Sequence, residues 1–88
     1  MIAFAGMGEH FGIGRAVEAM RRGFRVARDG WNGKGMYLFL CRTWTYTDGK
    51  QDNFPNDPFV AMKTAGNTVV PWLCSQADLL ADDYSIVD

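Results

Sequence analysis

The chain has 88 residues, 48% of them hydrophobic and 14% aromatic, which predicts one small folded domain rather than a disordered segment. The formal net charge of −1 argues against a duplex nucleic-acid binder, and no apolar run approaches the ~18 residues of a membrane span. Charge is nevertheless uneven: residues 1–44 hold seven Lys or Arg against three Asp or Glu, and residues 45–88 hold two against seven.

The N-terminal part reads as an extension followed by a helix. Residues 1–11 are glycine-rich and include the single histidine, His10; they predict a short strand or a loose arm ahead of a domain over residues 12–88. From Gly12 to Arg22 the pattern predicts a helix. Its apolar face consists of Ile13, Ala16, Val17 and Met20. Gly23 follows directly and suits the left-handed residue that ends a helix.

The rest of the chain alternates strand-like runs with turns. Strands are predicted over residues 24–28, 36–45, 59–64, 68–70 and 84–87. The run 36–45 is apolar on both faces, which predicts a central strand covered on both sides. Residues 65–67 form the turn of a hairpin. The polar excursion 47–58 is either a mobile loop or an arm.

A short helix is predicted near the C-terminus. Ser75 and, three residues later, Asp78 resemble a capping box, and the helix they open ends near Asp82. The order of elements therefore predicts an α+β fold: one small domain with a mostly antiparallel sheet, one N-terminal helix and one short C-terminal helix.

Residues 28–36 read Arg-Asp-Gly-Trp-Asn-Gly-Lys-Gly-Met and form the most unusual run of the chain. Three glycines in six positions are poor material for a helix or strand, but they suit a loop whose backbone N–H groups approach a ligand closely. Trp31 adds a flat apolar face and Lys34 adds a positive charge. The run therefore predicts a binding loop.

Catalytic chemistry finds little support. His10 lies in the least regular segment, and no Cys–His or Ser–His arrangement is visible. Gly-Lys-Gly at 33–35 is not a Walker phosphate loop, because the upstream glycine is missing and glycine stands where Ser or Thr is needed. Asp78, Asp82 and Asp83 suit acid–base work, but capping and solvation explain them better. We predict no catalytic residue, no metal and no cofactor.

The two cysteines, Cys41 and Cys74, fit no zinc or redox spacing, and each stands beside a leucine. This favours reduced, small core residues of a cytosolic protein. The first eleven residues lack the basic start and long apolar stretch of a signal peptide, which points to the same compartment.

Binding is better supported by the tryptophans. Trp44 ends the long strand and is predicted to lie in the core, whereas Trp31 and Trp72 suit either the core or a ligand platform. A planar anion such as a nucleotide would stack on these indoles and place its phosphates on N–H groups, Lys34 or Arg28. The candidate ligand-binding residues are Arg28, Trp31, Asn32, Gly33, Lys34, Met36, Trp72, Ser75, Gln76 and Asp78.

Affinity arithmetic points to an oligomer. A base stacked on an aromatic ring contributes about 1–3 kcal/mol and a charge-assisted hydrogen bond about 1.5–3 kcal/mol, against the ~12 kcal/mol of nanomolar binding. A lone 88-residue domain has too little material to surround a nucleotide, so tight binding predicts a pocket shared between subunits. The charge asymmetry fits solvated faces, an anion site, or a basic surface of one subunit docked on an acidic surface of another.

Three segments resemble one family. Residues 26–38, Val-Ala-Arg-Asp-Gly-Trp-Asn-Gly-Lys-Gly-Met-Tyr-Leu, are similar to the signature of a small phage and prophage family, once a domain of unknown function and now associated with Thoeris anti-defence 2. Residues 62–64 with 70–73, and residues 75–84, are similar to two further segments of that family. Tyr84 replaces the tryptophan expected at its position. The resemblance spans about residues 11–87.

The resemblance implies a non-enzymatic sponge. Members of the family sequester cyclic ADP-ribose-type signals made by bacterial TIR-domain proteins, and some also bind cyclic oligonucleotides. It further implies a homotetramer with ligand sites at subunit interfaces, acting in the cytoplasm of the infected bacterial host. The polar excursion 47–58 and Tyr84 depart from the pattern of the family, and the choice of ligand therefore stays open.

A second hypothesis is a protein-interaction module. In that case the arm around residues 46–59 and the acidic half of the chain would dock on a host protein and inhibit it directly. An enzyme that cleaves the signal is a third, less supported reading.

Overall fold

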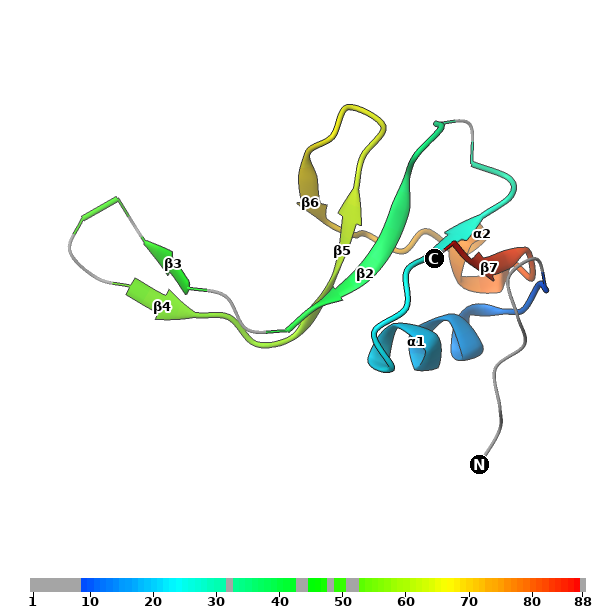
Figure 1. Ribbon diagram of the computed structural model, residues 1–88, viewed down its shortest axis with the longest axis horizontal. Helices are drawn as coiled ribbons and strands as arrows, with labels where there is room; N and C mark the ends of the chain where they lie inside the picture. Colours follow the sequence, from blue (N-terminus) through cyan, green and yellow to red (C-terminus); the bar gives the residue numbers. More distant parts are fainter. Residues whose placement is uncertain (1–8, 32, 43–44, 48, 51–52, 88) are drawn as a thin grey trace.

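The computed structural model describes residues 9–31, 33–42, 45–47, 49–50 and 53–87. The helices are α1 (Ile13–Arg21) and α2 (Gln76–Leu80), and the strands are β1 (Val26–Arg28), β2 (Tyr37–Cys41), β3 (Thr45–Thr47), β4 (Asn53–Pro55), β5 (Phe59–Lys63), β6 (Val69–Pro71) and β7 (Tyr84–Ile86). This confirms the predicted α+β class with an N-terminal helix and a short C-terminal one (Figure 1). None of the helices in the described part has the length and apolarity needed to cross a membrane.

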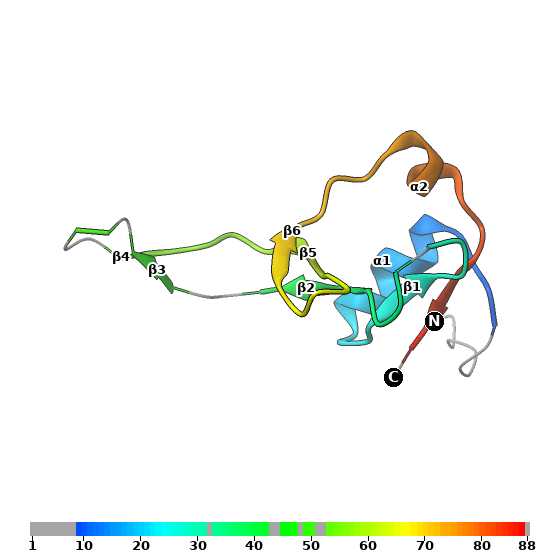
Figure 2. The same ribbon diagram turned by 90° about the horizontal axis from the view of Figure 1, so that it is seen from above.

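Five strands form one antiparallel sheet in the order β6-β5-β2-β1-β7. β2 lies at its centre, where Leu38 is opposite Val26 on one side and Met62 on the other. Helix α1 packs on the half of the sheet formed by β1, β2 and β7 (Figure 2). The chain therefore closes by bringing its last strand beside its first, and residues far apart in sequence meet there.

The core lies between α1 and this half of the sheet. Its buried members are Phe11, Ala16, Ala19, Met20, Val26, Leu38, Tyr84 and Ile86. Phe11 is 6% exposed and its backbone N–H donates to the Tyr84 carbonyl at 2.9 Å, so the structured domain already includes this residue. Residues 1–8 of the N-terminal extension lie outside the described residues.

Helix α1 ends as its sequence predicts. Gly23 has φ +94°, in the left-handed region that glycine adopts without a Cβ penalty. Its N–H donates to the Met20 carbonyl at 3.0 Å, and the N–H of Phe24 reaches back to the Ala19 carbonyl at 3.1 Å. These two bonds are a Schellman motif, which satisfies carbonyls that the helix end leaves unpaired.

The long strand is shorter than predicted, and this chain covers only one of its faces. β2 ends at Cys41, and Trp44, predicted to be a core residue, lies outside the described residues. Leu38 is fully buried, but Tyr37 and Phe39, which alternate with it, are only half-buried. Among the described elements only α1 packs on the sheet, so this chain covers one face of β2, and cover of the other face stays a prediction. The prediction of two core cysteines is also wrong, because Cys74 is exposed and Cys41 half-buried, both as free thiols.

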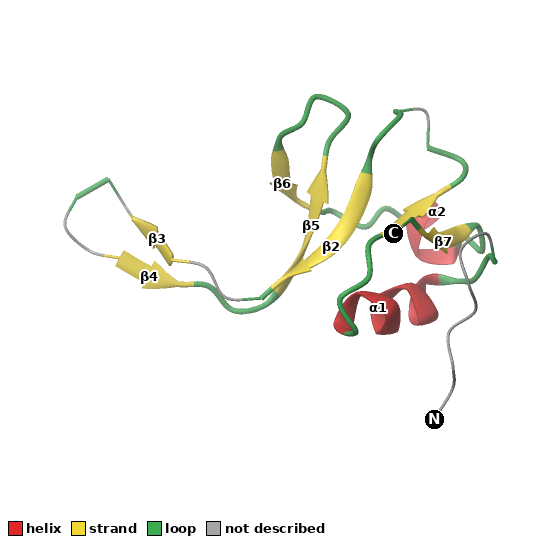
Figure 3. Cartoon of the chain, in the orientation of Figure 1, coloured by secondary structure: helices red, strands yellow, loops and turns green. Residues whose placement is uncertain are grey.

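The predicted hairpin and the polar excursion are both present. β5 and β6 are joined through a turn in which the Thr64 N–H donates to the Thr68 carbonyl at 2.8 Å and Asn67 has φ +64°. The excursion is an arm rather than a loop, because β3 and β4 pair with each other as a separate two-stranded sheet (Figure 3).

Candidate ligand-binding site

Arg28, the last residue of β1, is held by two carboxylates from the C-terminal segment. Its Nε donates to Asp83 Oδ1 at 2.7 Å and its Nη1 donates to Asp78 Oδ1 at 2.8 Å. The three side chains are 19%, 28% and 15% exposed for Arg28, Asp83 and Asp78. We call these three residues the Arg28 clamp. It exists because β1 pairs with β7 so that Arg28 is opposite Tyr84, directly beside Asp83.

Asp78 connects the clamp to three other groups. Its Oδ1 also accepts from Trp31 Nε1 at 3.2 Å, its backbone N–H donates to Ser75 Oγ at 3.1 Å, and its carbonyl accepts from the Tyr84 hydroxyl at 2.7 Å. The Ser75 bond confirms the predicted N-cap of α2. The Asp78 carboxylate, expected to serve in helix capping, also fastens helix α2 to strand β1 and to Trp31.

The charge states of these groups favour the hydrogen bonds that join Arg28 to Asp78 and Asp83. Burial raises the pKa of the Asp78 carboxyl, but hydrogen bonds from Arg28, Trp31 and Ser75 outweigh it and leave that pKa below its usual value. The hydrogen bond from Arg28 likewise lowers the pKa of Asp83. Burial, with the nearby Asp78 charge, raises the pKa of Tyr84 to about 12. At neutral pH the clamp therefore holds two carboxylates and one guanidinium, and Tyr84 is a hydroxyl donor.

Residues 29–36, which we call the Trp31 loop, are fastened at both ends. At the start, the Gly30 N–H donates to Asp83 Oδ2 at 2.9 Å, and the Asp29 N–H donates to the Asp83 carbonyl at 3.1 Å. At the end, the Gly35 carbonyl accepts from Lys63 Nζ at 2.9 Å, and Gly35 has φ +76°. The loop is thus tied to Asp83, which directly precedes β7, on one side and to Lys63 of β5 on the other.

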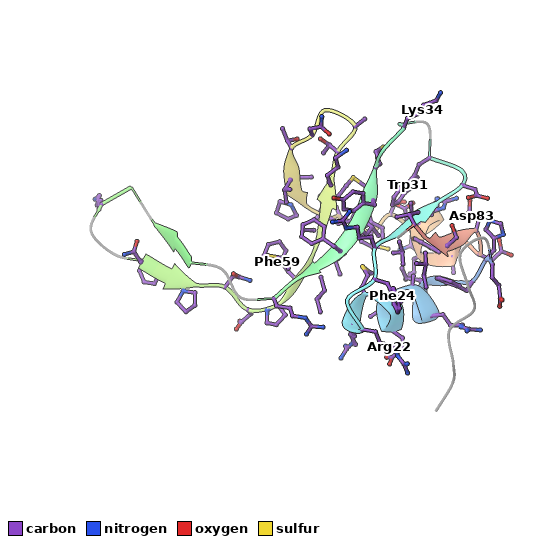
Figure 4. The ribbon with its side chains drawn as sticks, in the orientation of Figure 1. Arg22, Phe24, Trp31, Lys34, Phe59 and Asp83 are labelled. Carbon is purple, nitrogen blue, oxygen red and sulfur yellow. The ribbon has the colours of Figure 1, made fainter. Side chains whose placement is uncertain are left out.

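Trp31 is fixed within this loop. Its indole is half-buried against the core, and its ring meets the Tyr84 ring edge-on at a centroid distance of 6.5 Å and 85° between planes. With Nε1 bonded to Asp78, the indole is oriented from two directions. Lys34 is exposed at the tip of the loop, pointing away from the domain (Figure 4). The loop therefore presents a rigid indole and a solvated cation from one segment.

The structure brings some of the predicted residues together and not others. Arg28, Trp31, Ser75 and Asp78 form one connected network. Gly33 and Met36 lie toward the β5–β6 turn, since a Cβ on Gly33 would stand 3.1 Å from Met36 Cγ and 3.2 Å from Ala65 Cβ. Trp72 packs against the core and its N–H donates to the Val60 carbonyl at 3.0 Å. Gln76 is exposed, and Asn32 lies outside the described residues.

Two network members were missed by sequence reasoning. Asp83 was interpreted as a capping or solvated carboxylate, and Tyr84 as a departure that affects ligand choice. Tyr84 is instead 0% exposed and part of the core. The signal that could have found them is the strand pairing. If the predicted strands 24–28 and 84–87 are neighbours, Arg28 at the end of one lies close to Asp83 at the start of the other.

A pocket of about 450 Å³ adjoins the end of the Trp31 loop. It is lined by Arg25, Gly35, Met36, Tyr37, Lys63 and Val87, and we call it the basic pocket. Two cations face its aromatic ring: the Arg25 guanidinium carbon lies 4.8 Å from the Tyr37 ring centroid and Lys63 Nζ lies 5.8 Å from it. Of these six residues the sequence predicted only Met36 as a ligand contact, because Arg25, Tyr37, Lys63 and Val87 lie on or beside four different strands, β1, β2, β5 and β7.

The charges decide where an anion fits. Arg28 is already bonded to two carboxylates, and the first turn of α2 carries the Asp78 carboxylate, so neither offers uncompensated positive charge. Lys34 is exposed, and the described residues that line the basic pocket include Arg25 and Lys63 and no carboxylate. An anionic planar group is thus best matched by the loop tip and this pocket, with the Arg28 clamp as the support that holds the loop in place.

Two comparisons with known proteins cover this region. Residues 11–87 match the family model described as the Thoeris anti-defense 2-like domain. The chain is also similar to a protein of Bacillus phage SP01 named Thoeris anti-defense 2, at 38% identity over 82 residues, which are 85% of this chain and 92% of the relative. The family match includes the Arg28 clamp, the Trp31 loop and the basic pocket.

Proposed function

The chain belongs to the Thoeris anti-defense 2-like family of phage anti-defence proteins, and from that premise we propose that it binds and sequesters a cyclic-nucleotide immune signal without cleaving it. The signal is of the glycocyclic ADP-ribose type, and cyclic oligonucleotides are a second ligand class. The protein acts in the cytoplasm of the infected bacterial host. It works as a homo-oligomer, with a tetramer as the expected form.

The observation that carries this proposal is the basic pocket next to the rigid Trp31 loop. A volume of about 450 Å³ is within the range of pockets for small molecules, which is about 300–1,000 Å³. Arg25 and Lys63 both lie over the Tyr37 ring, at 4.8 and 5.8 Å from its centroid, so one aromatic side chain gathers two cations that offer phosphate contacts. Trp31 and Lys34 add an aromatic ring and a cation from the loop.

The limited cover that one copy provides supports the proposed oligomer. Lys34 is exposed, Trp31 and Tyr37 are half-buried, and the face of β2 that carries Tyr37 has no helix over it among the described elements. A ligand held by one copy alone would keep much of its surface in water, which limits affinity. A second subunit that covers this face would complete the pocket.

Calorimetric titration with a glycocyclic ADP-ribose isomer tests the binding step. We expect saturable binding, with cyclic dinucleotides titrated in parallel as the second class. If neither ligand produced heat of binding in calorimetry or a change in melting temperature, the proposal would be rejected. Storage is separated from cleavage by heating the complex, removing the denatured protein and examining the released ligand by mass spectrometry: intact ligand supports sequestration, and hydrolysed ligand overturns it.

Lys34→Gln tests the loop directly. Loss of one charge-assisted hydrogen bond costs about 1.5–3 kcal/mol, so we expect roughly 10- to 150-fold weaker binding with an unchanged melting temperature. Arg22→Gln is the charge-matched control, since Arg22 is exposed at the C-terminal end of α1 and is not among the residues that line the basic pocket. Equal affinity of the two variants would remove Lys34 from the site.

A further inference from the structure

Lys63, the last residue of β5, connects the basic pocket to the Trp31 loop. Its Nζ donates to the Gly35 carbonyl at 2.9 Å and lies 5.8 Å from the centroid of the Tyr37 ring. The sheet register sets this position, because Lys63 is directly opposite Tyr37 where β5 pairs with β2. One ammonium group therefore joins the end of the loop to the aromatic wall of the pocket.

The end of the Trp31 loop is held from the side of the β5–β6 hairpin. Gly35 has φ +76°, a conformation that favours glycine, and its carbonyl points to Lys63. Gly33 approaches the β5–β6 turn so closely that an added Cβ would lie 3.2 Å from Ala65 Cβ. Figure 1 shows the loop and this turn at the same end of the sheet. Lys34 stands between the two glycines, so its position depends on how firmly Lys63 holds Gly35.

The ammonium of Lys63 carries more donors than the loop uses. A lysine side chain has three N–H groups, and the Gly35 carbonyl accepts from one of them. Lys63 and Gly35 both line the basic pocket, and no carboxylate belongs to the described residues of that lining. An anion in the pocket can therefore accept from Lys63 while the bond to Gly35 stays in place.

Lys63 is also oriented before any ligand arrives. A lysine side chain has many rotamers, and a ligand that must order such a side chain loses affinity. Lys63 is half-buried and is held by the Gly35 carbonyl and the Tyr37 ring. Lys34, in contrast, is exposed at the loop tip (Figure 4). Lys63 is thus the fixed cation of the pair, and Lys34 is the cation whose position it can set.

We propose that Lys63 is a positioning residue that couples an anion in the basic pocket to the order of the Trp31 loop. An anion that accepts from Lys63 fixes the ammonium, and the fixed ammonium holds Gly35 and, with it, Lys34. By linkage, a loop held in this way binds the anion more tightly by the same factor. The inference rests on the proposed function, and it adds that the pocket and the loop act as one cooperative site.

Hydrogen exchange of the peptide that contains the Trp31 loop measures this coupling. The ligand is the glycocyclic ADP-ribose isomer, or a cyclic dinucleotide if calorimetry shows only that class to bind. At saturation it should slow exchange of the wild-type loop amides at least about fivefold. Lys63→Met should speed exchange in the free protein and abolish the response to ligand. Thr64→Val is the matched control, because the Thr64 hydroxyl bonds to Thr68 within the turn, and its loop should respond as in wild type.

A double-mutant cycle with Lys34 separates positioning from simple contact. If Lys63 only contacts the anion, the losses of affinity in Lys34→Gln and Lys63→Met multiply in the double variant. If Lys63 positions Lys34, the roughly 10- to 150-fold loss expected for Lys34→Gln should be at least about fivefold smaller in the Lys63→Met background. The same cycle with Thr64→Val in place of Lys63→Met should show losses that multiply.

The outcomes distinguish this inference from the proposed function. Losses that multiply in the Lys63 cycle, or a Lys63→Met loop that still responds to saturating ligand as the wild type does, overturn the inference and leave sequestration standing. A wild type that binds neither ligand class overturns both. Circular dichroism verifies that each variant is folded, and if Lys63→Met is unfolded, Lys63→Gln takes its place with the same expected results.

Discussion

Asp78→Asn is the most direct perturbation of the candidate site. The substitution keeps the size of the side chain and its acceptor oxygen, but it removes the charge that Arg28 and Trp31 share at 2.8 and 3.2 Å. A hydrogen bond to a charged group is worth about 1.5–3 kcal/mol and a neutral one about 1 kcal/mol. The Trp31 bond alone therefore predicts a loss of about 1 kcal/mol, and the weakened Arg28 pair adds to it in the same direction.

Chemical denaturation and thermal melting measure this loss. For a domain of this size 1 kcal/mol corresponds to a fall in melting temperature of about 4–8 °C. Asp82→Asn is the matched control, because Asp82 is exposed two residues beyond α2 and the same change there should leave stability within about 0.5 kcal/mol of wild type. If Asp78→Asn and Asp82→Asn unfolded at the same denaturant concentration and the same temperature, Asp78 would not be the centre of the network.

The same variant carries a pH dependence with a definite sign. The folded-state pKa of Asp78 lies below the usual 3.8, so its ionised form stabilises the fold above that value. This stabilisation is lost as the pH falls through the folded-state pKa. The advantage of wild type over Asp78→Asn should therefore be full at pH 7 and shrink below about pH 4. A difference that stayed constant down to acid pH would show that shape, not charge, accounts for the effect.

Two further predictions concern Tyr84 and Gly35. Tyr84→Phe leaves the Asp78 carbonyl without its 2.7 Å donor and should cost about 0.5–1.5 kcal/mol at neutral pH by denaturant unfolding. The pKa of Tyr84 is raised from 10 to about 12, so wild-type stability should fall as the pH rises from 10 toward 12, and a similar fall in Tyr84→Phe would contradict the assignment. Gly35→Ala should lose about 1–2 kcal/mol because φ is +76°, whereas Gly14→Ala, with nothing within 4 Å of its Cβ inside α1, should gain about 0.5 kcal/mol. Melting curves that rank these two alanine variants in the opposite order would contradict the loop geometry.

The fold was predictable where local patterns agree with tertiary packing. The α1 face, its glycine cap and the β5–β6 hairpin follow from spacing and turn chemistry that act within a few residues. The cover of β2 was not predictable, because its apolar residues Tyr37 and Phe39 indicate burial without saying by what. On a chain this small, apolar residues left half-buried on a central strand are surface that a ligand or second copy can use.

The candidate site was predictable as a set of residues but not as an arrangement. Trp31, Lys34 and Asp78 were identified from glycine framing and capping patterns, and the structure links Trp31 to Asp78 directly. Their bond spans 47 positions of sequence, a distance at which local patterns carry no information. Arg25, Tyr37 and Lys63 were missed for the same reason, because each looks like an ordinary strand residue until β1, β2 and β5 are placed side by side.

The geometry separates the two cations that the sequence treated alike. Arg28 and Lys34 were both predicted phosphate ligands, but a phosphate that took Arg28 would have to replace two carboxylates already bonded to it at 2.7 and 2.8 Å. It would also leave those partly buried carboxylates without their partner, and an uncompensated buried charge is strongly destabilising. Lys34 is exposed, and no carboxylate of the described residues is paired with it. We therefore expect Arg28→Lys to reduce stability first and ligand affinity only as the loop loosens, whereas Lys34→Gln reduces affinity alone. Measuring melting temperature and affinity on both variants separates a support from a contact, and equal effects of the two would contradict this division of roles.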